Sequence, residues 1–359
     1  MSQVNWGIVG AGNIAGSFVS DLLVNNSTDG EFVHRVVSIG CSSIEKGRAF
    51  IEKHGIVADK NGGYSVVAQL YDEFYQNPDI DVVYVASPHQ FHKTQVIAAL
   101  NNGKHVLVEK PICLTEKDTQ ELVDLAKSKS LFLMEAVWTR FFPLILQLKH
   151  LIFEKKVLGD LIRLFVDFSY DAQVSSLPPT SRVRDINLGA SALLDIGVYS
   201  ITYARVLLDQ QLGKNHKKFG VKSFLNIDPI DKVDHSGSFL IHYADGIQAI
   251  LTCNELSNGM KPFLRLEGTE ATVEIYAENP ACPLKSVITF NDNREPITYH
   301  TDATYKGFIY EANAVARDIT TGKSQNDLMP NDESLLVMNI MDNIRYENNF
   351  RFPQEEGSK

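Results

Sequence analysis

Two glycines near the N-terminus stand where a phosphate-binding turn needs them. Gly10 and Gly12 follow the apolar run 4–9 and precede residues 14–23, whose apolar side chains recur at helical spacing. Gly10 would permit a tight turn, Gly12 would let the backbone approach a pyrophosphate, and Ala15 would let the helix pack closely on the strand. This order of strand, turn and helix favours a dinucleotide site over a purely structural turn. The residues expected to face the phosphates are Gly10, Gly12, Asn13 and Ile14.

The end of the next predicted strand, residues 34–39, indicates which dinucleotide to expect. An NAD site places a carboxylate there to bind the hydroxyls of the adenosine ribose, but this chain has Ser42, Ser43 and Lys46. Two hydroxyls and an ammonium suit a 2'-phosphate, which a carboxylate would repel. NADP is therefore expected, with NAD less favoured. The serines could instead cap the predicted helix 44–53, and one could do so while the other binds.

Three further predicted strands end in side chains that can bind ligands or transfer protons. Ligands of an open α/β sheet bind at the carboxyl ends of its strands, so these ends are the best candidates for an active site. The segments are Ser87-Pro88-His89-Gln90-Phe91-His92, Glu109-Lys110-Pro111 and Glu135-Ala136-Val137-Trp138-Thr139-Arg140-Phe141-Phe142-Pro143.

Strands and helices alternate around these segments. Apolar runs at 82–86, 105–108 and 131–134 have the length of buried strands. Helical patterns at 91–100 and 115–127 separate them. Repeated strand–helix units predict a parallel sheet with right-handed crossovers, so an α/β Rossmann domain is expected over residues 1–136.

These motifs together carry a family resemblance. Glu109-Lys110-Pro111, after an apolar strand and downstream of the glycine turn, resembles the glucose-fructose oxidoreductase and inositol dehydrogenase family. The run 133–143, with Trp-Thr-Arg-Phe-Phe-Pro at its end, is similar to the family's branch of dimeric dihydrodiol dehydrogenases and NADP-dependent D-xylose dehydrogenases. The resemblance continues through 192–199, 310–317 and 328–334 and covers nearly the whole chain. It implies hydride transfer between a nicotinamide and the carbinol of a polyol, either a D-xylose-like aldopyranose or a trans-dihydrodiol.

The resemblance also implies two catalytic residues, Lys110 and Tyr199. Inositol-oxidising members commonly have histidine at the position of Tyr199, so tyrosine points to the dihydrodiol and xylose branch. Oxidation of a carbinol requires a group that takes the hydroxyl proton, and a lysine ammonium close to a tyrosine favours its phenolate form. Tyr199 is therefore expected to act as acid/base and Lys110 as its activator, although Lys110 could carry the proton itself.

Other site residues follow from the same resemblance. The branch often has arginine where this chain has Ser42, which weakens the NADP assignment without favouring NAD. His89, His92, Trp138 and Phe168 could instead be loop or core residues, and Asp195 could either hold its helix turn or orient Lys110. The remaining expected cofactor contacts are Ser87, His92, Glu109, Lys110, Trp138 and Arg140. The expected substrate contacts are His89, Trp138, Phe168, Asp195 and Tyr199.

The second half of the chain predicts an α+β domain, residues 137–359, with an open, mainly antiparallel sheet. A helix at 143–155, a strand at 161–170 and a helix at 190–208 precede a series of short strands. Asp245-Gly246 is a typical hairpin turn. The expected strands are 221–226, 236–243, 247–253, 263–267, 271–276, 287–290 and 296–300. Helices at 308–320 and 331–346 close the chain, the second expected to pack on the first domain, and the resemblance implies a homodimer through the sheet.

Composition excludes several classes of function. The formal net charge is −10 and the sequence pI about 5.5, which disfavours binding to nucleic acid. The four cysteines are scattered without zinc-ligand spacing, so no metal site is expected. No signal peptide or membrane span is expected, and a cytoplasmic enzyme follows. Two alternatives stay open, namely a non-catalytic NADP-sensing regulatory protein and a reductase of linear tetrapyrroles.

Overall fold

The computed structural model describes residues 2–26, 30–292, 294–302 and 304–356. The chain forms two compact units. The first contains residues 1–113, 117–138 and 304–331, and the second contains 114–116, 139–303 and 332–359. A segment near the C-terminus therefore belongs to the N-terminal unit. The boundary expected at 136/137 stays a prediction.

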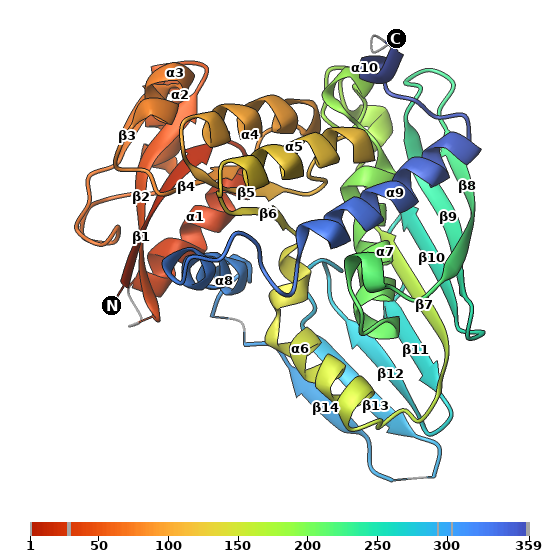
Figure 1. Ribbon diagram of the computed structural model, residues 1–359. Coiled ribbons are helices and arrows are strands. Elements are labelled where there is room, and N and C mark those ends of the chain that lie inside the picture. The colour runs from red at the N-terminus through yellow and green to blue at the C-terminus, as the bar shows by residue number, and fades with distance from the viewer. Residues whose placement is uncertain (1, 27–29, 293, 303, 357–359) are drawn as a thin grey trace. The chain divides into compact units, whose positions relative to one another are not determined.

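The first unit is built on a six-stranded parallel sheet in the order β3-β2-β1-β4-β5-β6 (Figure 1). Its strands are β1 (Ser2–Val9), β2 (Phe32–Cys41), β3 (Val67–Leu70), β4 (Val82–Val85), β5 (His105–Glu109) and β6 (Leu133–Ala136). The helices along this part of the chain are α1 (Asn13–Asn26), α2 (Ile44–Lys53), α3 (Tyr71–Gln76), η1 (His89–Phe91), α4 (His92–Asn101), α5 (Glu116–Ser128), η2 (Trp138–Phe141) and α8 (Phe308–Thr320). The predicted Rossmann domain is confirmed.

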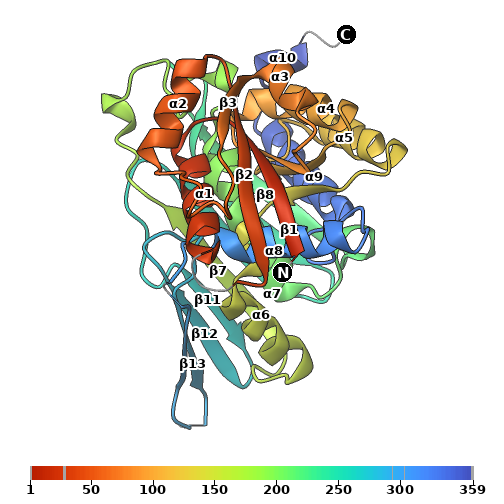
Figure 2. The same ribbon diagram turned by 90° about the vertical axis from the view of Figure 1, so that its left-hand side faces the viewer.

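Burial on both faces explains why the central strands are almost wholly apolar. All four residues of β4 are buried, as are the last four of β1. Helices α1 and α8 lie along one face and α4 and α5 along the other, as Figures 1 and 2 show. The strand order reverses between β1 and β4, which is where such sheets bind their ligands.

Two elements of this unit were not predicted. Strand β3 is a four-residue edge strand, and its residues are exposed or half-buried. It therefore lacks the apolar run that marked its neighbours. Helix α3 follows it directly and has only six residues, too short for a clear helical period.

The second unit is built on an eight-stranded sheet in the order β14-β13-β12-β11-β7-β10-β9-β8. Neighbouring strands are antiparallel except β7 and β10, which run parallel, so the expectation of a mainly antiparallel sheet is confirmed. The strands are β7 (Leu161–Ser169), β8 (Phe219–Ile227), β9 (Asp234–Tyr243), β10 (Gln248–Asn254), β11 (Leu264–Gly268), β12 (Ala271–Tyr276), β13 (Lys285–Phe290) and β14 (Ile297–His300). Its helices are α6 (Pro143–Lys149), η3 (His150–Glu154), η4 (Val174–Ser176), η5 (Ile186–Leu188), η6 (Leu193–Gly197), α7 (Val198–Leu208), η7 (Gly213–Asn215), α9 (Asn331–Glu347) and α10 (Pro353–Glu356).

The Asp245-Gly246 hairpin forms as predicted. Gly246 has φ +92°, a conformation that favours glycine, and its N–H donates to Tyr243 O at 3.0 Å. Strands β9 and β10 then pair with Gln248 opposite His242. Helix α9 belongs to the second unit, and its expected contact with the first domain stays a prediction.

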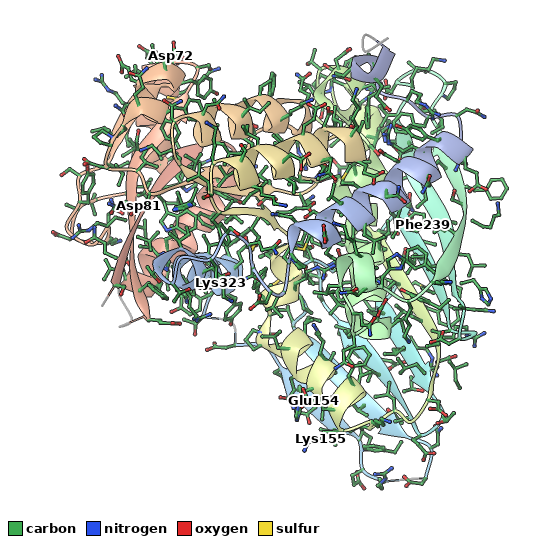
Figure 3. All side chains as sticks on the ribbon, in the orientation of Figure 1. Asp72, Asp81, Glu154, Lys155, Phe239 and Lys323 are labelled. Carbon is green, nitrogen blue, oxygen red and sulfur yellow. The ribbon has the colours of Figure 1, made fainter. Side chains whose placement is uncertain are left out.

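The core of the second unit lies between α7 and one face of its sheet. Every residue of α7 is buried, and the helix packs on β7 and β10. Phe239, labelled in Figure 3, is one of the buried side chains that β9 contributes. The stretch Ile186–Leu208 is long and apolar enough to cross a membrane by length and composition, a feature that the sequence analysis did not anticipate, but 94% of its most apolar 18-residue window is buried inside the protein. Such burial is typical of a core helix.

The predicted helices 143–155 and 190–208 are not regular α-helices. In each, a five-residue π-helical turn adjoins the α-helix, η3 after α6 and η6 before α7. A π-turn adds one residue to a helical turn, so side chains beyond it shift to a different face from the one that a regular period predicts. Since η6 ends at Gly197, two residues before Tyr199, this shift affects the direction of a predicted catalytic side chain.

Candidate active site

The turn between β1 and α1 has the geometry of a dinucleotide cradle. Gly10 has φ +100°, and a Cβ there would lie 2.6 Å from Ala86 O, so only glycine fits. At Gly12 a Cβ would meet no atom within 4 Å, because its Cα faces open space. Asn13 and Ile14 are exposed at the start of α1, where backbone N–H groups and the helix dipole favour a phosphate. These residues fit a bound dinucleotide.

Ser42 and Ser43, just after β2, could either cap helix α2 or bind a ligand, and the structure gives them different contacts. Ser43 is the N-cap of α2, with its side chain accepting from Lys46 N at 3.4 Å. Ser42 is exposed, and Lys46 Nζ lies 3.5 Å from its Oγ. The backbone N–H of Glu45 itself and the Ser43 hydroxyl lower the pKa of the Glu45 carboxyl. Ser42 and Lys46 therefore lie beside each other at the surface, and their contact with a 2'-phosphate stays a prediction.

His92 joins the ends of β4 and β5. Its Nδ1 lies 2.8 Å from Pro111 O and its Nε2 lies 2.8 Å from Ser87 O, and the ring is fully buried. Burial is the largest influence on the pKa of His92 and lowers it, with Lys110 adding to the effect. With both nitrogens against carbonyl groups, His92 holds the turn that follows Lys110. Its expected contact with a ligand stays a prediction.

Glu109 is the last residue of β5 and Lys110 follows it, and the two side chains differ in how deeply they are buried. Glu109 is buried and its Oε1 accepts a hydrogen bond from the hydroxyl of Tyr84 on the neighbouring strand. Lys110 is half-buried. In the next strand, Glu135 Oε1 accepts from Ile112 N at 3.1 Å and so fixes the chain just beyond Pro111. Hydrogen bonds to Pro111 and Ile112 thus hold the backbone beside Lys110 on two sides.

Trp138 lies in an aromatic layer of the first unit. Its ring stacks on Phe308 of α8, with centroids 4.0 Å apart and planes 15° from parallel. Phe308 meets Phe18 edge-on, and Phe18 stacks on Tyr84 at 3.9 Å. His89 is half-buried, and its ring lies 5.7 Å from that of His92. The roles of Trp138 and His89 toward a substrate stay predictions.

The second unit brings together Tyr199, Phe168 and Asp195. Tyr199 is the second residue of α7, just after the π-turn, and is buried, with its ring 5.5 Å from that of Phe168 on β7. Asp195 lies within the π-turn, and its Oδ2 accepts from Arg182 Nη1 at 3.0 Å. Asp195 is the largest cause that raises the pKa of Arg182. The turn is compact, because a Cβ at Gly197 would lie only 3.1 Å from Leu193 Cδ1.

The buried carboxyl group of Asp234 supports the backbone at the start of this π-turn. Asp234 Oδ2 accepts from Leu193 N at 2.8 Å, and burial raises the pKa of Asp234 to about 7. The next residue, His235, places Nδ1 3.2 Å from Glu255 Oε2. Hydrogen bonding to Glu255 raises the pKa of His235 against the opposing effect of burial. Sequence reasoning missed Arg182, Asp234 and Glu255, since none belongs to a motif.

Arg140 occupies a buried ion-pair cluster. Its Nη2 lies 2.8 Å from Glu333 Oε1, and the two side chains are 2% and 0% exposed. Glu333 also accepts from Arg205 Nε at 3.0 Å and from Gly213 N at 2.7 Å, while Arg205 pairs with Asp209. This partner set gives Arg140 a structural task. Its expected place near the cofactor stays a prediction.

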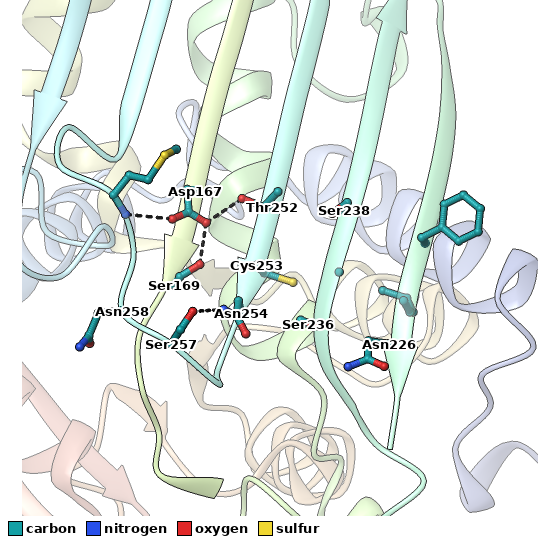
Figure 4. A pocket seen from close by; sticks show the side chains of 14 residues that line it. Asp167, Ser169, Asn226, Ser236, Ser238, Thr252, Cys253, Asn254, Ser257 and Asn258 are labelled. Atoms are coloured by element: carbon teal, nitrogen blue, oxygen red, sulfur yellow. Dashed lines mark hydrogen bonds between the residues drawn. The ribbon is translucent and has the colours of Figure 1, made fainter. Parts of the chain in front are cut away.

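The face of the second sheet opposite α7 carries a polar hollow of about 690 Å³ (Figure 4). Asp167 lies at its floor, where its Oδ1 accepts from Ser169 Oγ at 2.6 Å and Thr252 Oγ1 at 2.7 Å. Oδ2 accepts from Met260 N at 3.1 Å. Phe224 stands at the rim with 82% of its surface exposed. Tyr199 and Phe168 belong to the opposite, helix-covered layer of this unit.

The fold, the glycine turn of the first unit and the residues around the π-turn of the second unit together define a class of protein. Residues 4–137 match the GFO/IDH/MocA oxidoreductase family with an NAD-binding Rossmann fold, and residues 145–274 match the C-terminal domain of the same family. The chain belongs to this family, which confirms the predicted resemblance.

Two relatives and one solved structure show which oxidoreductases of known activity the chain is similar to. The chain is 30% identical to D-xylose 1-dehydrogenase (NADP(+)) of Hypocrea jecorina, over 98% of this chain and 93% of that protein. It is 29% identical to trans-1,2-dihydrobenzene-1,2-diol dehydrogenase of Xenopus tropicalis, over 94% of this chain and 96% of that protein. A crystal structure of a 3-ketoreductase from Actinomadura kijaniata shares the fold, with a TM-score of 0.76 at 22% identity over 96% of this chain and 98% of that one.

The predicted site residues therefore fall into two sets. The first unit gathers Gly10, Gly12, Ser42, Ser87, Glu109 and Lys110 at the carboxyl ends of one sheet. The second gathers Phe168, Asp195 and Tyr199 around one π-turn. The approach of Lys110 to Tyr199 stays a prediction. Among the described residues, no group of three or more His, Cys, Asp or Glu is arranged to hold a metal ion.

Proposed function

We propose that this protein is an NADP-dependent dehydrogenase that oxidises a CH–OH group of a sugar or a trans-dihydrodiol. The observation that carries the proposal is the 27–30% identity, along almost their full length, to dehydrogenases of both kinds. Those relatives are enzymes, so the alternative of a non-catalytic NADP sensor has no support among them. Both substrate classes present adjacent hydroxyls on a six-membered ring.

The chemistry divides between a cofactor and two side chains. When bound, the nicotinamide accepts the hydride of the carbinol carbon. Tyr199 takes the hydroxyl proton in this proposal, and the Lys110 ammonium favours the phenolate that receives it. Direct proton transfer to Lys110 is the alternative. Hydrogen bonds to Pro111 and Ile112 would keep Lys110 in place during the transfer.

The choice of NADP over NAD rests on the end of β2. Ser42 and Lys46 are exposed beside each other there, while Ser43 caps α2. An exposed hydroxyl and an ammonium supply the donors that a 2'-phosphate needs. The NADP dependence in the name of the Hypocrea jecorina relative agrees with this choice.

A spectrophotometric screen tests the activity. Purified protein is mixed with NADP or NAD and with aldopentoses, aldohexoses or cyclic diols, and the absorbance of the reduced nicotinamide is followed. Lys110→Ala and Tyr199→Phe should abolish any activity found, whereas the exposed Lys127→Ala serves as the matched control and should keep it. Equal activity in all four proteins would indicate a contaminating enzyme and contradict the proposal.

We further propose a cytoplasmic homodimer that pairs through the open face of the second sheet. Phe224 and Met260 expose 82% and 64% of their surfaces on this face, beside the polar hollow. A second copy would cover both kinds of surface. Sedimentation velocity should show a dimer, and Phe224→Asp should shift it toward monomer with the fold intact. A monomeric native protein would refute the pairing.

A further inference from the structure

Glu311, on the buried side of α8, is a carboxyl group in a place that suits a neutral residue. It is 0% exposed, and neither oxygen has a hydrogen-bond partner among the residues that the structure describes. Removing an ionised carboxylate from water without a partner is costly, so the group neutralises instead. Burial, followed by the charge of Glu109, raises the pKa of Glu311 well above its ordinary value. Glu311 therefore keeps its proton where an exposed glutamate has lost it.

Helix α8 is fixed against α1 in a way that leaves Glu311 little freedom. Asp21 of α1 accepts from Lys306 N at 2.9 Å and from Gly307 N at 2.8 Å, at the start of α8. Phe308, one turn before Glu311, stacks on Trp138. Because residues three apart share a helix face, Glu311 lies toward the same layer as Phe308.

Among the charged groups around this layer, Glu109 is the one whose charge raises the pKa of Glu311. Asp21 uses both carboxylate oxygens on the backbone of α8, and His34 of β2 places Nε2 2.9 Å from Asn313 Oδ1. Burial lowers the pKa of His34 to about 4, so this ring is neutral. The titratable groups that border this layer include Asp21, His34, Tyr84, Glu109 and Lys306.

We propose that Glu311 and Glu109 form a buried carboxyl pair that binds one proton, and that Glu311 is a positioning residue which, by staying neutral, leaves Glu109 undisturbed at the cofactor end of β5. Two anions this far from water repel strongly, so the pair titrates as a unit and keeps one proton. Tyr84 already donates to Glu109, which favours the charge on Glu109 and the proton on Glu311.

The proposal has a consequence for cofactor binding. Should Glu311 ionise at alkaline pH, repulsion would displace Glu109 from the Tyr84 hydroxyl. Because Glu109 adjoins Lys110 at the end of β5, dinucleotide affinity should then fall. Glu311→Gln cannot ionise and should bind the dinucleotide equally well at neutral and alkaline pH. A side chain that only fills space would give no such difference in pH profile.

Infrared spectroscopy gives a readout that needs no substrate. The native full-length protein, with NADPH bound, should show a protonated-carboxyl stretch from Glu311 at neutral pH, and the difference spectrum against Glu311→Gln should isolate it from the stretch of Asp234, whose pKa is about 7. Glu109→Gln removes the neighbouring charge, so the band should persist but titrate at lower pH than in the native protein. Absence of the band from the native protein at neutral pH would overturn the proposal, even if the variants failed to fold.

Thermal unfolding supplies the second test. A group whose pKa is raised on folding weakens the fold as pH rises, by up to tenfold in the folding equilibrium per pH unit above its ordinary pKa. The Tm of Glu311→Gln should therefore gain on that of the native protein as pH rises above the ordinary pKa of a glutamate. Asp318→Asn is the control on the same helix, since Asp318 accepts from Asn326 Nδ2 at 2.5 Å and pairs with Lys323. Parallel pH profiles for the native protein and Glu311→Gln, in both Tm and NADPH affinity, would contradict the pairing.

Discussion

Glu333→Gln should destabilise the second unit by about 3 kcal/mol, because Glu333 is the shared anion between two buried arginines. Arg140 lies 2.8 Å and Arg205 3.0 Å from its carboxylate. The two arginines and the Gly213 N–H hold the pKa of Glu333 at about 2, against the opposing effect of burial. A depression from 4.5 to about 2 corresponds to about 3 kcal/mol at roughly 1.4 kcal/mol per unit. Breaking a buried pair costs about 3–5 kcal/mol, which agrees.

Calorimetry or circular dichroism measures this loss as a fall in Tm of about 10 °C, since about 1 kcal/mol shifts the Tm of a unit of this size by about 2–4 °C. The sign of the pH dependence follows from the lowered pKa. The stabilisation is fully present above about pH 4.5 and is lost as pH falls toward about 2, so native and variant should converge in acid. The neighbouring Asp332→Asn is the matched control. Its partner Lys214 is 81% exposed, and the expected change is below about 0.5 kcal/mol. A loss below about 1 kcal/mol for Glu333→Gln would refute this account of Arg140.

Four further outcomes are expected. Lys110→Ala and Tyr199→Phe should each lower kcat by orders of magnitude with nearly unchanged dinucleotide Kd in a fluorescence titration, and near-normal turnover would refute the role assigned. Ser42→Asp should shift preference from NADP toward NAD, and unchanged Kd values for both would show that the ribose site is elsewhere. Trp138→Ala should raise KM for a pyranose or cyclic diol more than it alters NADP affinity, and the reverse pattern would assign Trp138 to the cofactor. The Tm of Asp234→Asn should rise relative to that of the native protein between about pH 4 and the folded pKa of about 7, because Asp234 loses its proton more readily in the unfolded chain. A Tm difference that stays constant with pH would refute the raised pKa.

The first sheet could be predicted from the sequence because its strands are buried on both faces. Apolar runs such as 82–86 have the length of a buried strand, and the observed β4 covers Val82–Val85. The expected helix 44–53 coincides with α2, since Ser43 supplies the cap that marks its start. The edge strand β3 carried no such signal. An edge strand pairs with a neighbouring strand along one edge only, and it can be short and polar.

The second unit shows a different limit. Strands such as β12 alternate buried and half-buried residues, so their periodicity was sufficient to find them. The π-turn η6 is invisible to periodicity, because all five residues of Leu193–Gly197 are buried and the segment fits an α-helix equally well. The side chains that support it, Asp234 and Arg182, come from a distant strand and an irregular loop. Only the fold brings such residues to one place.

The Glu109-Lys110-Pro111 motif shows why some supports of a site could have been predicted and others could not. Glu109 faces Tyr84, as strand alternation requires, because Tyr84 pairs with Leu107 and Leu107 shares a face with Glu109. Pro111 presents its carbonyl to His92, whose place at the start of α4 gave no hint of that partner. Glu311 did leave a signal, since it falls at helical spacing among the apolar residues of α8, where a carboxylate is out of place unless it keeps its proton. A glutamate on the apolar face of a predicted helix therefore indicates a carboxyl group that keeps its proton, and in our proposal the neighbouring charge that adds to this effect is Glu109, the first residue of the motif.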